Sequence, residues 1–507
     1  MERDLPSPRR KLLGSISRTS RRRYIIILSV LFITALLTMA IPEVSWGAYK
    51  GIFALWFLIY IGLLYLIVGS DILARIERLD PMWIIVGLFL FSLILYLPFL
   101  LNGPSMSQDI MRLERRGELL MDGRFPYRDF DVNKPPLYIW MVGLISLPFG
   151  PDQLVFRTFF VVTSSLVPVI MYLIHRSQTE KKEAPPEDPG GLIPTGFNWF
   201  SASIGYMLCP ILLLEIGSAG HFDPIVVLLT VLSYYFLIKK RPLFSGITLG
   251  MGLALKLYPM FIAPLFFLSY PRWKDRIIFT IGLIAPTLLS AIPLLLVDPS
   301  LVYEYIGYQF YGWSTGISIR GAIEGGLDQV GLPLDIAYFL MMGSLLFAIL
   351  FFTIKGFFSK IRRLDISWIL VMMLSFSLIG VLLSAVYLSE YDGGPLDMAL
   401  GWSGLGFSIL FSGLGLYIFS RWGTSDHGSI GITDLKRVLT GHIDPKRVPF
   451  LIVCILIVLI LTSAQFHTWY IIWTIPFLLA SGNPYFIWSM LIIFSTFQIN
   501  GYLPWDI

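Results

Sequence analysis

Long apolar runs alternate with short polar connections along this chain, a pattern typical of membrane-spanning helices. Many runs reach about 18 residues, close to the length at which a helix crosses about 30 Å of hydrocarbon. An outer-membrane barrel would instead show alternating segments of about 10 residues. The pattern therefore predicts an all-α integral membrane protein with roughly 11 to 13 transmembrane helices.

The basic residues beside these runs set the predicted orientation, because cytoplasmic flanks are rich in Lys and Arg. Residues 1–23 carry eight basic and two acidic residues, which predicts a cytoplasmic N-terminus. Residues 1–81 would form this terminus and two additional spans, and residues 82–507 the main transmembrane domain. A third span at about 82–101 then places residues 102–134 outside.

The later runs continue the alternation, with two ambiguous places. Residues 135–150 form a short run, and it stays open whether they cross the membrane completely. Residues 245–268 predict either a tight helical pair or one broken helix, with Lys256 and Pro259 near its outer tip. Other spans are expected at about 24–41, 51–69, 154–174, 197–217, 225–237, 277–297, 333–357, 366–388, 403–420, 448–464 and within 470–499.

Composition agrees with a multi-pass protein of a cell membrane. Charged residues make up 14% of the chain, against about 25% in soluble domains. The net charge of +5 is expected from basic cytoplasmic loops and does not argue for a nucleic-acid partner. Cys209 and Cys454 both lie in apolar runs and suggest neither a disulfide nor a metal site.

The densest charge lies in residues 101–134, with six acidic and six basic residues. Within it, residues 107–122 have apolar positions at helical spacing and predict an amphipathic helix at the interface, its apolar side in lipid. Asp109, Arg112 and Arg116 share another face of this helix. They form either a salt-bridged surface or a carboxylate base beside guanidinium groups that bind a phosphate. The apolar positions are Met106, Ile110, Leu113, Gly117 and Leu120.

Farther along the same loop, Asp129 and Asp131 form a DxD sequence. This motif holds a metal and a nucleotide sugar in many soluble transferases, but alone it matches often by chance. A divalent metal is therefore one candidate cofactor, and its ligands stay unknown.

Three later motifs add polar residues at predicted outer span ends. In GHFDP, Asp223 is a candidate helix cap and also, with His221, a candidate polar wall of a cavity, and the two interpretations are compatible. In KLYP, Lys256 either reaches to the interface or points into a cavity, since ionisable groups within apolar runs are functional candidates. In QFHTWY, His467 is able to donate to a phosphate, whereas Tyr470 is also typical of an interfacial belt.

These motifs, taken in order, resemble the lipid-linked-sugar glycosyltransferases of the GT-C superfold. The similarity covers about residues 82–480 and rests on SQD, GRFPYRDFDVNKPPLY, GHFDP, GMGLALKLYP and FHTWYIIWTIPFL. It implies a polyprenyl- or dolichyl-phosphate sugar donor, with a hexose such as mannose, and a glycan, lipid or protein acceptor. Asp109 would be the catalytic base of a one-step inverting transfer at the outer face. Donor-phosphate and substrate contacts would come from Arg112, Arg116, His221, Asp223, Lys256, Arg320, His467 and Tyr470, with Asp129 and Asp131 as acidic partners.

The chain also departs from that family pattern. Gln108 and Ile110 flank Asp109, so the adjacent carboxylate that some branches carry is missing, which weakens a metal-dependent interpretation. The main alternative is a multi-spanning transporter or lipid flippase, which predicts inverted repeats that the sequence does not show. A second alternative is a membrane scaffold that has lost its catalysis.

Overall fold

The computed structural model describes residues 18–39, 46–68, 71–101, 107–180, 198–302, 443–462 and 468–481, with residues 487, 490 and 491. Two compact units divide the chain. Unit 1 comprises Met1–Lys256, Leu283–Tyr305 and His467–Ile507, and unit 2 comprises Leu257–Gly282 and Ile306–Phe466. Throughout the described ranges the regular structure is helical and contains no strand, as the all-α prediction requires for this part of the chain.

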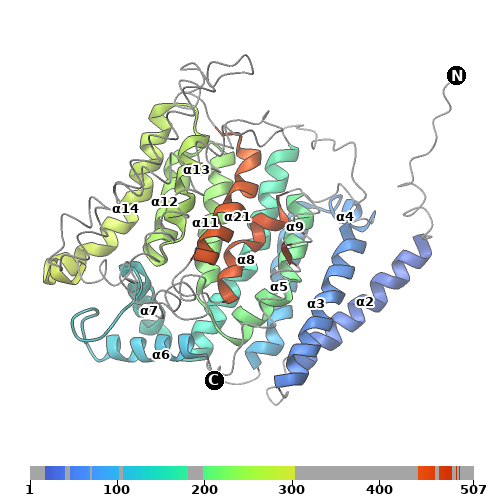
Figure 1. The fold of residues 1–507 in the computed structure, drawn as a ribbon, viewed down its shortest axis with the longest axis horizontal. Helices are drawn as coiled ribbons and strands as arrows, with labels where there is room; N and C mark the ends of the chain where they lie inside the picture. The colour runs from blue at the N-terminus through green and yellow to red at the C-terminus, as the bar shows by residue number, and fades with distance from the viewer. Residues whose placement is uncertain are drawn as a thin grey trace, which may run out of the picture. The chain divides into compact units, whose positions relative to one another are not determined.

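Unit 1 holds most of the described helices (Figure 1). The first are α2 (Arg18–Met39), α3 (Trp46–Val68), α4 (Asp71–Ile76), α5 (Pro81–Leu101), α6 (Gln108–Met121), α7 (Pro136–Phe149) and α8 (Gln153–Thr179). They are followed by α9 (Trp199–Met207), α10 (Pro210–Leu212), the π-helix η1 (Leu213–Ser218), α11 (Asp223–Ile238), α12 (Pro242–Leu255), η3 (Thr468–Trp473) and α22 (Ile475–Leu479).

Unit 2 contains α13 (Pro259–Ser269), η2 (Pro445–Arg447) and α21 (Val448–Thr462), and α14 (Trp273–Val297) begins in it. α13 packs on α21, and the Ile443 amide donates to the Leu268 carbonyl at 2.9 Å. Arg276 is buried and donates to the Tyr270 carbonyl at 2.8 Å, with its guanidinium 5.0 Å from the Trp273 ring. These contacts satisfy the backbone where the chain turns between α13 and α14.

Three of the described helices, α5, α8 and α14, are long and apolar enough to cross a membrane. Their bounds agree with the spans expected at 82–101, 154–174 and 277–297. Large apolar side chains such as Trp83, Ile94 and Leu296 are exposed on them, as lipid-facing positions would be. Membrane helices are therefore confirmed in the described part, whereas the spans expected between 333 and 420 lie outside the described residues.

Three other apolar runs form short or broken helices. Residues 197–217, expected as one span, are bent by 45° between α9 and α10, because Pro210 lacks the N–H that would continue the α9 hydrogen-bond ladder. α7 has 14 residues and is about 21 Å long, less than a full span. The run at 245–268 is broken at Lys256, which takes an extended backbone between α12 and α13.

The amphipathic helix expected in residues 107–122 is α6, which lies beside α7 (Figure 1). Its apolar side was expected to face lipid, and the structure corrects this. Ile110 and Leu113 are 0% and 1% exposed because they pack against the protein itself. Gly117 permits the close approach, since a Cβ there would lie 2.6 Å from Pro151 Cβ and 2.7 Å from Ser146 Oγ.

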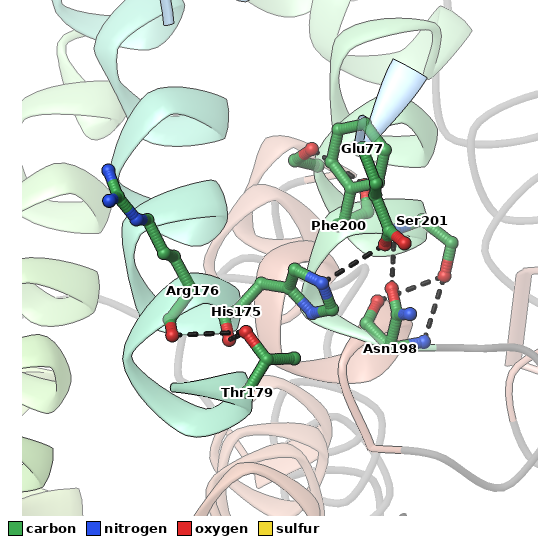
Figure 2. A network of polar contacts seen from close by, with 8 residues as sticks. Glu77, His175, Arg176, Thr179, Asn198, Phe200 and Ser201 are labelled. Atoms are coloured by element: carbon green, nitrogen blue, oxygen red, sulfur yellow. Dashed lines mark hydrogen bonds and ion pairs between the residues drawn. The ribbon is translucent and has the colours of Figure 1, made fainter. Parts of the chain in front are cut away.

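α8 carries polar contacts near both of its ends. Near its C-terminal end, His175 Nε2 lies 3.0 Å from Glu77 Oε1, and its ring lies 6.0 Å from that of Phe200 (Figure 2). Near its N-terminal end, the buried Arg157 donates to the carbonyls of Gly217 and Phe99. At about 1.5 Å per residue, roughly 27 Å separate Arg157 from His175. The helix therefore separates two polar clusters by nearly the thickness of a bilayer core.

Replacing Gly117 with Ala should lower stability by about 1–3 kcal/mol, because the added methyl would overlap Pro151 and Ser146 and push α6 away. Thermal unfolding of the purified protein in detergent measures this change. Gly87→Ala is the matched control, since it also lies in a helix and a Cβ there meets no protein atom within 4 Å. Equal melting temperatures for the two variants would contradict the close packing of α6.

Candidate active site

The site is built around His221, which lies between two carboxylates. Its Nδ1 is 3.3 Å from Asp109 Oδ2, and its Nε2 is 3.2 Å from Glu215 Oε2. The histidine side chain is 3% exposed, the Glu215 side chain 0% and the Asp109 side chain 27%. Thus α6 supplies the partly exposed carboxylate, and η1 supplies the buried one.

The backbone turn between η1 and α11 brings His221 back beside Glu215. The His221 amide donates to the Glu215 carbonyl at 3.2 Å, after the wide π turn of η1. Gly220 has φ 71°, a left-handed conformation that favours glycine. A Cβ at this position would lie 3.0 Å from Arg157 Cγ and 3.1 Å from Ile110 Cδ1. The glycine therefore lets α6 and α8 approach this turn closely.

Arg157 fixes the same turn from α8. Its Nη2 donates to the Gly217 carbonyl at 2.7 Å and also to the Phe99 carbonyl, and its Nε lies 3.2 Å from the former. Carbonyls near the ends of η1 and α5 have no continuing helix to satisfy them. One buried guanidinium thus holds α5, α8 and η1 together beside the His221 cluster.

His221 carries a positive charge at neutral pH. Burial alone would lower its pKa, but the hydrogen bonds and charges of Asp109 and Glu215 outweigh it and raise the pKa to about 9. Burial likewise tends to raise the pKa of Asp109. The His221 hydrogen bond and the charges of His221, Lys134 and Lys256 oppose burial and hold that pKa well below its usual value. Asp109 is therefore ionised beside an imidazolium.

A second charge pair lies next to this cluster. Lys256 Nζ is 2.7 Å from Asp223 Oδ1, and Trp473 Nε1 donates to the same oxygen. Asp223 is 1% exposed and occupies the first turn of α11, where the helix dipole favours a negative charge. It does not cap the helix, because Phe222 is the N-cap residue and the Asp223 carboxylate binds Lys256. The structure therefore favours the polar wall over the cap.

Aromatic rings surround the Lys256 ammonium group. It lies 5.1 Å from the ring centroid of Phe222 and 4.7 Å from those of Tyr470 and Trp473, which stack on each other. The break in the helix before Pro259 brings the amine to this position. Tyr470 thus contributes its face to the site.

Lys134 approaches the same Phe222 ring, with its Nζ 5.9 Å from the centroid. No carboxylate lies within ion-pair distance of this amine among the residues described. Burial lowers the pKa of Lys134 to about 8, and the charge of Lys256 adds to the effect, while Asp109 and Asp223 oppose it. Among the described residues, Lys256 is therefore neutralised by an ion pair, whereas the Lys134 amine contacts only a ring.

The two expected arginines of α6 have different surroundings. Arg116 is half-buried and donates to Tyr138 Oη and to Asn133 Oδ1, each at 3.2 Å. Arg112 is 57% exposed; its Nη1 is 4.0 Å from Asp109 Oδ1, and it binds Gln108. Arg116 thus fixes the chain next to Lys134, while Arg112 lies at the exposed edge of the site.

The DxD pair does not join this cluster. Asp129 accepts from Arg128 and from the Phe125 amide, which hold its pKa at about 2, and Asp131 is exposed. Within the described ranges, no group of three or more His, Cys, Asp or Glu side chains is arranged to hold a metal ion. Two other expected residues, Arg320 and His467, lie outside the described residues.

Three residues of the site were not among those expected from the sequence: Glu215, Lys134 and Trp473. Glu215 interrupts the apolar run PILLLEIG, and the rule that selected Lys256 applies to it equally. Lys134 was one of many charges in its loop, and Trp473 was one of several aromatic residues near a span end. Nothing local distinguishes these two from their neighbours.

Replacing Lys256 with Met should destabilise the protein by about 3–5 kcal/mol, because it leaves the buried Asp223 carboxylate without its counter-charge. The double variant Asp223→Asn/Lys256→Met should recover much of this loss, since an amide oxygen still accepts from Trp473. Melting temperatures of both variants and of Asp223→Asn form a double-mutant cycle. Strictly additive losses would show that the pair makes no interaction.

Comparison with known proteins identifies the family of this chain. No curated protein matches the chain in a sequence search. The family model of glycosyltransferase family 87 matches residues 135–412. The matched range contains Glu215, His221, Asp223 and Lys256, whereas Asp109 lies before it. Because the match spans more than half of the chain, this protein belongs to glycosyltransferase family 87.

Proposed function

We propose that this glycosyltransferase moves a hexose such as mannose from a polyprenyl- or dolichyl-phosphate donor to an acceptor hydroxyl, with Asp109 as the base. The acceptor is a glycan, a lipid or a protein. The proposed site faces the outer side of a cell membrane, with the N-terminus in the cytoplasm, in keeping with the eight basic residues in 1–23.

The geometry of Asp109 supports its role most directly. One carboxylate oxygen, Oδ2, lies 3.3 Å from His221 Nδ1, while Oδ1 lies 4.0 Å from Arg112 Nη1, beyond hydrogen-bond distance. No hydrogen bond to Oδ1 occurs within the described part of the chain. An ionised oxygen that is partly exposed and not yet engaged is what a general base presents to a substrate hydroxyl.

The proposed reaction is a single displacement. Asp109 Oδ1 takes the proton of the acceptor hydroxyl, and the acceptor oxygen attacks the anomeric carbon of the donor sugar. The bond from that carbon to the phosphate oxygen breaks, and its electron pair leaves with the polyprenyl phosphate. Attack opposite the leaving group inverts the anomeric centre.

A leaving phosphate needs a positive group, and Lys134 fits this role best among the described cations. Lys256 is already paired with Asp223, and Arg116 is bound to Tyr138 and Asn133. Lys134 is half-buried, its charge acts on Asp109, and among the described residues its amine contacts only the Phe222 ring, at 5.9 Å. Stabilisation where charge develops is often the largest catalytic contribution. Arg112, Arg320 and His467 remain further candidates for this contact.

Membership of a glycosyltransferase family favours an enzyme over the alternative of a transporter or lipid flippase. A lipid-linked donor suits the apolar helices α5 and α8, because its polyprenyl chain is able to stay in the bilayer beside them. Its phosphate then reaches the end of the bundle where Arg157 and His221 lie.

Asp109→Asn should reduce transfer by about 10²- to 10⁴-fold, since an amide cannot take the acceptor proton. The assay uses purified protein in nanodiscs, radiolabelled polyprenyl-phosphate mannose or glucose, and a membrane extract as acceptor. Asp122→Asn is the matched control, an exposed carboxylate at the end of the same helix. Full activity of Asp109→Asn would move the base to another residue, and no transfer by the wild type from either donor would reject the proposed donor class.

Lys134→Met should lower kcat/KM for the donor by about 10- to 100-fold, through loss of a charge-assisted contact to the phosphate. Lys134→Arg should retain most of the activity, because it keeps the positive charge. Arg115→Met is the control, an exposed cation of α6 that pairs with Glu118. Equal effects of the Met substitutions at 115 and 134 would remove Lys134 from the donor site.

A further inference from the structure

Glu215 requires an explanation that the proposed reaction does not give. Its carboxyl group is 0% exposed and lies in a π-helical turn within an apolar segment. Burying an ionised carboxylate is costly unless a charged or hydrogen-bonding partner compensates it. The partner here is His221 Nε2 at 3.2 Å, and the same imidazole contacts Asp109 through its other nitrogen. Glu215 is therefore one imidazole ring away from the proposed base.

The two contacts determine the form of the histidine. A neutral imidazole has one N–H donor and one acceptor nitrogen, so it is able to donate to only one carboxylate. Two carboxylates within ion-pair distance of its two nitrogens favour the imidazolium, which has an N–H group on each nitrogen and a positive charge. Without Glu215, the ring would be free to lose the Nε2 proton or to take the other tautomer.

We propose that Glu215 is a positioning residue for sugar transfer: it holds His221 as an imidazolium whose Nδ1 lies against Asp109 Oδ2, so that Oδ1 stays turned to the acceptor. This proposal rests on the function proposed above. Glu215 also limits how far the imidazolium lowers the basicity of Asp109. A lone imidazolium would weaken the carboxylate beside it, whereas the negative charge of Glu215 offsets part of that positive charge.

Other charged groups surround this triad and bear on its pH dependence. Arg157 of α8 binds the η1 carbonyl two residues after Glu215 and stays charged. Lys256 acts on Asp109 but is paired with Asp223 of α11. Lys134, from the loop before α7, also acts on Asp109, and its pKa of about 8 overlaps the alkaline range. A kinetic test must therefore remove the titration of Lys134.

The direction of the expected change in the His221 pKa follows from the contacts of its ring. Glu215 raises the pKa of His221, so Glu215→Gln should lower it by about one unit or more. The imidazolium is then lost at a lower pH, and Asp109 loses its fixed orientation there. The alkaline limb of the kcat profile should move to lower pH by the same amount, while a merely structural defect would scale the whole profile without moving the limb.

Two measurements test this. The first compares kcat profiles of Lys134→Arg and Lys134→Arg/Glu215→Gln, since arginine does not titrate in this range. The second follows the ¹⁵N resonances of His221 in histidine-labelled protein in nanodiscs, assigned by their absence in His221→Gln. It needs no substrate, so it tests the triad even if the proposed donor is wrong. Glu118→Gln, an exposed carboxylate of α6, is the control in both.

The proposal expects His221 to titrate near pH 9 in the wild type and at lower pH in Glu215→Gln, with the alkaline limb moving alongside. Glu215→Asp, which keeps the charge, should restore part of the shift. A wild-type His221 that titrates near its ordinary value would overturn the proposal without any variant. An alkaline limb that stays in place while the His221 resonances shift would overturn the link to catalysis.

Discussion

The burial of the Glu215 carboxylate is the constraint around which this end of unit 1 is organised. A carboxylate with 0% exposure needs a positive partner, and the chain supplies it six residues later by the wide turn of η1 and the left-handed Gly220. The absence of a side chain on Gly220 then admits Arg157 and Ile110 to the turn. Because His221 also contacts Asp109, the need to compensate the buried Glu215 carboxylate constrains the position of Asp109 as well.

The charged residues of the site form two groups, one that is neutral as a whole and one that carries a net charge. Lys256 and Asp223 neutralise each other inside a ring of aromatic side chains, which leaves that part rigid and without a net charge. The triad of Asp109, His221 and Glu215 keeps one net negative charge, and Lys134 lies close enough to act on it. With Asp109 as the proposed base and Lys134 as the proposed phosphate contact, the two groups would act at the two ends of one displacement.

Local pattern predicted the elements of this fold well and their contacts poorly. Apolar runs gave α5, α8 and α14 within a few residues, and helical spacing gave α6, because these depend on neighbouring residues. Helical spacing did not reveal that the apolar side of α6 meets protein instead of lipid, since that depends on Pro151 and Ser146. Asp109 and His221 were both expected in the site, but their contact joins distant parts of the chain, and only the Glu215 carboxylate explains it.

A comparison within the same chain shows what burial adds to a histidine–carboxylate pair. Near the other end of α8, His175 contacts Glu77, whose side chain is 36% exposed, so water is able to compensate that carboxylate. His221 contacts a carboxylate that water does not reach, and a second one on its other nitrogen. The first pair is able to open at little cost, while opening the second would separate two buried charged groups. The proposed base, Asp109, lies in the second arrangement, which is better able to keep its orientation through each reaction cycle.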